Sequence, residues 1–103
     1  MFEILVPEAH DSMSKVTLDG TIYRLRFTYN GDYDYWSIGI YDENDNAIVP
    51  MTKIVPLANL FPYPYDDLPK GTLFCYSKQD DVHENDFKNR IAHIVYLEEG
   101  DTA

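Results

Sequence analysis

The dipeptide Asp19-Gly20 stands between two stretches in which apolar and polar residues alternate. A two-residue hairpin turn of type I′ needs positive φ at both central residues, and Asp-Gly is a common solution. Such a turn places Leu18 opposite Thr21 and Val16 opposite Tyr23. Opposed residues share one face of a sheet, so this hairpin predicts a sheet with one apolar side.

A second reversal is predicted at Asn30-Gly31. Whether its loop holds two or four residues, the period of two puts Trp36, Ile38 and Ile40 on the apolar side of the first hairpin. Three consecutive strands then contribute to one buried face. The predicted core of the sheet consists of Val16, Leu18, Tyr23, Leu25, Phe27, Trp36, Ile38 and Ile40.

On the opposite face of the same strands, arginines on one strand lie beside tyrosines on its neighbour. Stacking and cation–π contacts between such neighbours stabilise a sheet face by about 0.5–1 kcal/mol each, and tyrosine is favoured at protein interfaces. This face is therefore either solvated or covered by a partner. Together with an aromatic, proline-bearing loop it forms the candidate interface, namely Arg24, Arg26, Tyr33, Tyr35, Tyr41, Phe61, Tyr63 and Tyr65.

Further short apolar runs predict the remaining strands. They cover residues 2–6, 47–49, 51–55, 71–76 and 91–97, with Pro50 and Pro56 confining two of them to edges or bends. One helical turn is expected at 57–61, and a weaker helical tendency at 84–90. The pattern predicts an all-β fold, a small antiparallel β-sandwich or partly open β-barrel of seven or eight strands. We expect one domain over residues 1–98 and a frayed acidic tail over 99–103.

Charge and cysteine content restrict the function. The 103 residues carry a formal net charge of -10, which disfavours a nucleic acid or an anionic membrane as partner. The single cysteine, Cys75, excludes an intramolecular disulfide and fits a reducing compartment. We expect neither a signal peptide nor a membrane span, because the opening residues lack a basic region and no apolar run approaches about 20 residues.

No motif predicts catalysis, a metal or a cofactor. Asp42-x-Asn44-x-Asn46 begins like a calcium loop but has Ala47 where the glycine belongs. His83-Glu84 begins like a zincin helix, with Phe87 in the place of the second histidine. Adjacent carboxylates in exposed loops lack the burial that separates the pKa values of an acid–base pair. Cys75 is expected to be a packed strand thiol.

Three classes of function are considered beside an enzyme, which no motif supports. The first is a non-enzymatic protein that acts through protein–protein contacts. The second is a soluble binding module whose exposed tyrosines stack on sugar rings. The third is an acidic mimic of DNA, which needs carboxylates at duplex-like spacing along one surface; here the acids lie mainly in turns and in the tail.

The order of the segments resembles a known family. Val16-Thr17-Leu18-Asp19-Gly20, Tyr29-Asn30-Gly31, Ile54-Val55-Pro56, Leu68-Pro69-Lys70-Gly71 and Ile94-Val95-Tyr96-Leu97 follow one another as in the baseplate plug or hub proteins of contractile-tailed bacteriophages. The resemblance covers residues 2–98. It implies a late virion protein without catalytic residues, made in the host cytoplasm and packed among hub, spike or tail-tube proteins. Because tail rings are symmetric, a homo-oligomer is an open expectation.

Overall fold

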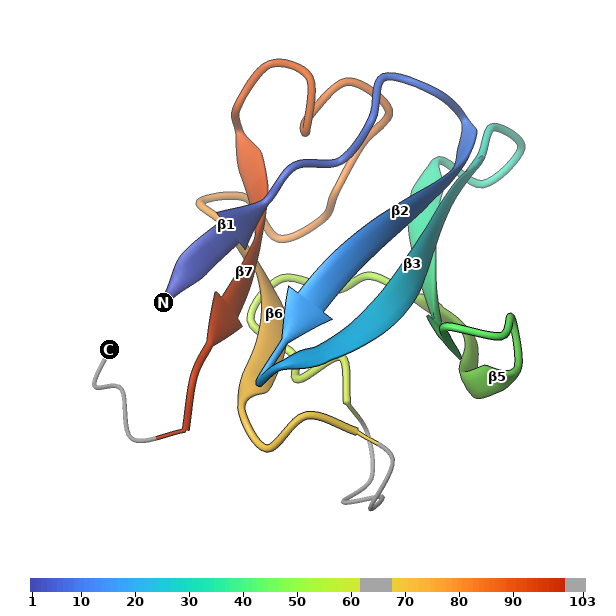
Figure 1. Cartoon of the computed structure of the whole chain (residues 1–103). Helices are drawn as coiled ribbons and strands as arrows, with labels where there is room; N and C mark the ends of the chain where they lie inside the picture. Colours follow the sequence, from blue (N-terminus) through green and yellow to red (C-terminus); the bar gives the residue numbers. More distant parts are fainter. Residues whose placement is uncertain (62–67, 100–103) are drawn as a thin grey trace.

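Seven strands in two antiparallel sheets make up the fold. The computed structural model describes residues 1–61 and 68–99. The strands are β1 (Phe2–Ile4), β2 (Asp11–Leu18), β3 (Thr21–Asn30), β4 (Tyr35–Asp42), β5 (Ala47–Lys53), β6 (Thr72–Ser77) and β7 (Ala92–Leu97). One sheet has the order β1-β7-β6 and the other β2-β3-β4-β5; Figure 1 shows the first on the left and the second on the right. The described residues contain no helix, and therefore none that could cross a membrane. The predicted all-β, sandwich-like fold is confirmed.

The first hairpin has the predicted register. Val16 pairs with Tyr23 and Leu18 with Thr21. Asp19 has a φ of 54° and Gly20 a φ of 81°, the two positive values that a type I′ turn requires.

The second hairpin closes with a loop of four residues, because Asn30 pairs with Tyr35. The Asn30 side-chain oxygen accepts the backbone N–H groups of Asp32 at 3.0 Å and Tyr33 at 3.2 Å, which stabilises the turn. This loop brings Ile38 opposite Phe27, as the parity argument requires.

The core lies between the two sheets. Of the eight residues predicted to form it, Leu18, Tyr23, Leu25, Phe27, Trp36, Ile38 and Ile40 are buried, and Val16 is half-buried against them. The other sheet contributes Ile4, Leu73, Cys75, Ala92, Ile94 and Tyr96. Apolar area removed from water on both sides is the main stabilising contribution, about 25 cal/mol per Å².

A buried tyrosine joins the sheets at one end. The Tyr96 hydroxyl donates to Oδ2 of Asp19 at 2.7 Å and accepts the Gly71 N–H at 3.0 Å. The same Asp19 oxygen accepts the Lys70 N–H at 3.0 Å. The turn between β2 and β3 is thereby attached to both β7 and the segment before β6.

The strand boundaries near the N-terminus differ from the prediction. β1 ends at Ile4 rather than at Val6. β2 begins at Asp11, four residues before the predicted start, and its inward positions there are Ser12 and Ser14. Because these two inward side chains are polar, the alternation of apolar and polar residues does not extend to this part of the strand, and the prediction began the strand too late.

β5 is one strand rather than the two predicted around Pro50. Ile40 pairs with Val49 and Ile38 with Thr52, so Pro50 and Met51 together lie opposite Gly39. A bulge on an edge strand accommodates a proline, since the missing N–H removes no regular ladder bond.

The helical turn predicted at 57–61 is wrong. Leu57 has a φ of 67°, and its N–H donates to the Cys75 carbonyl at 2.8 Å. The Leu60 N–H donates to the Leu73 carbonyl at 2.7 Å, so this segment runs along the outer edge of β6. Residues 84–90 form successive turns rather than a helix. Of the acidic tail predicted at 99–103, only residue 99 is described.

Candidate contact surface and the clusters around it

The outer face of the β2-β3-β4-β5 sheet carries four of the predicted interface residues. Arg24 lies opposite Tyr41, Arg26 lies on the same strand, and Tyr35 stands near the start of β4. Lys15 and Lys53 point to the same side, because they pair with Arg24 and Ser37. This face, which we call the Arg–Tyr face, therefore holds half of the eight cationic side chains of a strongly acidic chain.

Carboxylates hold both guanidinium groups against the sheet. Arg26 binds Asp11 through two bonds, from Nη2 to Oδ2 at 2.7 Å and from Nε to Oδ1 at 3.0 Å. These bonds lower the pKa of the Asp11 carboxyl. Arg24 Nη1 lies 3.0 Å from Asp45 Oδ1, in the turn between β4 and β5. These bonds fix the orientation of the guanidinium planes, so a stacking contact with them would cost less side-chain entropy.

The middle of the Arg–Tyr face is filled by side chains from the edge strand β5. Lys53 Nζ lies 5.4 Å from the centroid of the Tyr35 ring, a cation–π contact. Met51 crosses Gly39: its sulfur lies 2.5 Å from the point where a Cβ on Gly39 would stand. Because Gly39 has no side chain, the bulge in β5 can place the flexible, exposed Met51 thioether over it.

Of the other predicted interface residues, Tyr33 and Phe61 lie away from this face. Tyr33 projects from the β3–β4 loop and is 79% exposed. Phe61 is 6% exposed and packs edge-to-face on Tyr96, with ring centroids 6.5 Å apart. Its assignment as a surface contact is corrected, because the segment along β6 turns this ring into the core. Tyr63 and Tyr65 lie outside the described residues.

A hydrogen-bonded cluster joins the β3–β4 loop to the segment before β7. Asp34 accepts the Tyr29 hydroxyl at 2.6 Å through Oδ1, and its Oδ2 lies 2.7 Å from His83 Nδ1. The Tyr29 and His83 hydrogen bonds lower the pKa of Asp34, and the bond to Asp34 raises the pKa of His83. The ion pair therefore ties the second hairpin to the 83–90 turns, across the two sheets.

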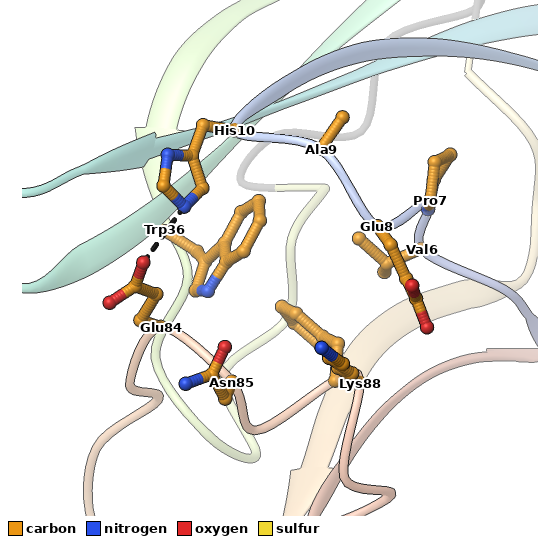
Figure 2. A pocket seen from close by; sticks show the side chains of 10 residues that line it. Val6, Pro7, Glu8, Ala9, His10, Trp36, Glu84, Asn85 and Lys88 are labelled. Atoms are coloured by element: carbon orange, nitrogen blue, oxygen red, sulfur yellow. Dashed lines mark hydrogen bonds and ion pairs between the residues drawn. The ribbon is translucent and has the colours of Figure 1, made fainter.

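A pocket beside this cluster lies over Trp36. Figure 2 shows His10 and Glu84 pointing toward each other in front of the indole, and His10 Nε2 lies 2.9 Å from Glu84 Oε2. The Trp36 Nε1–H donates to the His83 carbonyl at 3.1 Å. The indole also packs edge-to-face on Phe87, at 5.5 Å between centroids.

The chemistry of this pocket is limited. Its polar lining consists of the imidazole of His10, the carboxylates of Glu8 and Glu84, the amide of Asn85 and the ammonium group of Lys88. His10 and Glu84 are both largely exposed and bind each other. Nowhere in residues 1–61 and 68–99 do three His, Cys, Asp or Glu side chains converge as metal ligands. The arrangement suits a structural clamp between the loop that precedes β2 and the 83–90 turns.

An apolar groove lies on the outer face of the β1-β7-β6 sheet. It is lined by Met1, Phe2, Glu3, Phe74, Tyr76, His93 and Val95. Glu3 accepts two bonds of 2.8 Å from Arg90 and lies 2.8 Å from His93 Nδ1; the Arg90 bonds are the main reason why the pKa of Glu3 is lowered.

Sequence reasoning missed this groove and the histidine pairs. The unbroken apolar run Leu73-Phe74-Cys75-Tyr76 was a signal for the groove, because a strand that is apolar on both faces leaves one apolar face outside a two-layer fold. The pairs of His10 and His83 join residues 74 and 49 positions apart, so no local pattern reveals them.

Two other motifs have structural roles. Asp42 Oδ1 accepts the N–H groups of Asn44 at 2.8 Å and Asn46 at 2.9 Å, so this carboxylate closes the β4–β5 turn. Cys75 is fully buried, and burial raises the pKa of its thiol to about 11.

Comparison with known proteins shows the family of this chain. A family model described as cyanophage baseplate Pam3 plug gp18 matches residues 1–99. A search of the curated proteins finds no match.

Proposed function

Since the chain belongs to the family of the cyanophage baseplate Pam3 plug gp18, a structural protein of the phage baseplate, we propose that it acts through its Arg–Tyr face. In this proposal the face binds a neighbouring baseplate protein during assembly of a contractile tail. The chain performs no catalysis, and it folds in the host cytoplasm before it enters the virion.

The observation that carries the proposal is the composition of this face. The face carries four cations, Lys15, Arg24, Arg26 and Lys53, in a chain whose net charge is -10. Among the described residues, Asp11 and Asp45 form ion pairs with the two arginines. Local positive charge on an acidic protein favours one orientation of approach to a partner. Tyrosine and arginine are also the residues that most often dominate the binding energy of interfaces.

The chemistry of the face indicates the complementary surface. Both guanidinium groups already have a carboxylate, so their flat faces, the Tyr41 ring and the side of the Tyr35 ring away from Lys53 offer surfaces for stacking. Lys15 adds a cation at the edge strand β2. We infer that the partner offers aromatic or planar side chains, with carboxylates at the side of β2.

Particle incorporation of tyrosine variants tests the proposal. We compare Tyr35→Ala with Tyr76→Ala, a matched change of an exposed tyrosine on the outer face of the other sheet. Each variant is supplied in trans to a phage that lacks the gene, and the purified particles are analysed by mass spectrometry. We expect Tyr35→Ala to keep its melting temperature within a few degrees and to lower incorporation at least tenfold, with Tyr76→Ala incorporated normally.

Two results contradict the proposal. Loss of incorporation with Tyr76→Ala but not with Tyr35→Ala would move the contact to the apolar groove of the other sheet. Absence of the wild-type chain from purified virions would remove the assignment to the baseplate altogether.

A further inference from the structure

The outer edge of β2 has backbone groups that nothing in the described chain pairs. The Tyr29 N–H donates to the His10 carbonyl at 2.8 Å, which marks His10 and Tyr29 as a bonded position of the β2–β3 ladder. Bonded and non-bonded positions alternate along an antiparallel pair, so the even-numbered residues of β2 bond to β3. The backbone groups that point to the open side belong to Asp11, Met13, Lys15 and Thr17.

The other sheet edges among the described residues are less available. β5 is interrupted by Pro50 and its bulge, and β1 has only three residues. The edge of β6 is covered by the bonds from Leu57 and Leu60. β2 offers eight residues without a proline, the kind of edge to which another strand adds.

We propose that a second copy of this chain adds to this edge, antiparallel, across a two-fold axis at Met13. Pairing Met13 with Met13 of the second copy brings Asp11 opposite Lys15 of that copy, and Lys15 opposite its Asp11. All three positions have their backbone groups on the open side, so each pair exchanges two N–H···O bonds. A two-fold interface requires a self-complementary edge, and this edge places an acid and a base symmetrically about Met13.

The inward side of β2 supplies a second argument. The Ser12 hydroxyl is buried and has no hydrogen-bond partner in the described structure. The same register places Ser12 directly opposite Ser14 of the second copy, at a non-bonded position where side chains approach closely. Pairing of the two copies gives this hydroxyl the partner that it lacks.

The net charge of -10 opposes association, and it does so mainly at long range. At an ionic strength of about 0.15 M the Debye length is about 8 Å, so contacts across the edge are retained while most of the repulsion is screened. The dimer therefore becomes more stable as salt rises from low to physiological concentration. This inference is independent of the proposed function, because it concerns the free chain.

Two proline variants test the pairing by sedimentation velocity over a concentration series. The wild-type chain is expected to approach twice its mass of 12.0 kDa. Lys15→Pro removes an N–H within the proposed ladder and should leave a monomer at every concentration. Thr17→Pro places the same ring on the same edge of β2, beyond the Asp11–Lys15 ladder, and should still dimerise. Neither proline removes a bond to β3, and circular dichroism checks that both variants fold.

Cysteine cross-linking provides a readout that does not depend on proline. In the proposed dimer, Met13→Cys places the new thiol of one copy opposite the same thiol of the second copy at the two-fold axis. Paired residues of neighbouring strands have Cα atoms about 5.5 Å apart, a separation that a disulfide accepts. Mild oxidation should link Met13→Cys into a dimer and leave Thr17→Cys monomeric, since Cys75 is buried in both.

Three outcomes would overturn the inference. The first is a wild-type mass of 12.0 kDa at all concentrations. This result would also be obtained if another protein, rather than a second copy, covered β2 in the particle. The second is a dimer that persists in folded Lys15→Pro, and the third is equal cross-linking at positions 13 and 17.

Discussion

Replacement of Trp36 by alanine measures how strongly the 83–90 turns are coupled to the four-stranded sheet. Trp36 is 3% exposed, packs on Tyr29 at 5.4 Å and Phe87 at 5.5 Å between ring centroids, and donates to the His83 carbonyl. A tryptophan buries about 150–250 Å², which at about 25 cal/mol per Å² corresponds to about 4–6 kcal/mol. The alanine methyl group recovers part of this.

We therefore expect Trp36→Ala to lower the free energy of unfolding by about 3–5 kcal/mol, the usual range for loss of a buried tryptophan. Trp36 itself lines the pocket of Figure 2, so after its removal water can replace the indole donor at the His83 carbonyl without a further large cost. Urea denaturation followed by far-UV circular dichroism gives the value, because the variant no longer has its only tryptophan.

Trp36→Phe is the matched control for this change. It keeps a ring against Tyr29 and Phe87 and removes the N–H donor, so we expect a loss of about 1–2 kcal/mol. A change below about 1 kcal/mol for Trp36→Ala would show that the pocket collapses around alanine at little cost. It would then refute the view that this indole joins the turns to the sheet.

Three further predictions concern links between the sheets. Tyr96→Phe should cost about 1.5–3 kcal/mol in urea denaturation, the range for a hydrogen bond to a charged group, because the Asp19 carboxylate and the Gly71 N–H both lose the buried hydroxyl; a neutral result would contradict it. Gly71→Ala should lower the melting temperature by several degrees, since a Cβ there would stand 2.3 Å from the Leu97 carbonyl oxygen and 2.5 Å from the Tyr96 hydroxyl. The Asp34–His83 pair should stabilise the chain most between pH 3.8 and 6.5, the ordinary pKa values of the two groups. The contribution of His83, whose pKa is raised on folding, disappears as the pH rises through that raised value, and the contribution of Asp34, whose pKa is lowered, disappears as the pH falls through the lowered value. The difference in melting temperature between the wild type and Asp34→Asn should therefore disappear toward acid pH and fall toward alkaline pH to the part that the Tyr29–Asp34 bond contributes. A constant difference would exclude the ion pair as the cause.

Local sequence information was sufficient where turn chemistry and alternation coincide. Asp19-Gly20 and the alternation around it predicted the register of β2 and β3, because a one-residue slip would have turned Leu25 and Phe27 out to solvent. The loop length at the second hairpin did not matter, since two and four residues give the same parity.

Prediction was weaker where distant residues decide the local conformation. Residues 57–61 contain helix-compatible side chains, yet they bond to the edge of β6 because this edge needs partners for its backbone groups. Phe61 follows that segment into the core. The pocket over Trp36 and the His83–Asp34 pair arise only after the sheets have packed, so no spacing in the sequence indicates them.

The place of β7 at the centre of its sheet has a consequence for biosynthesis. β1 and β6 belong to one sheet only because both pair with β7, which is the last of the seven strands to be synthesised. A nascent chain can form both N-terminal hairpins early, but Ile4, Leu73 and Cys75 cannot become a layer until residues 92–97 have been translated. A chain that is truncated before residue 92 should therefore be retained by chaperones or degraded by proteases, rather than be partly functional.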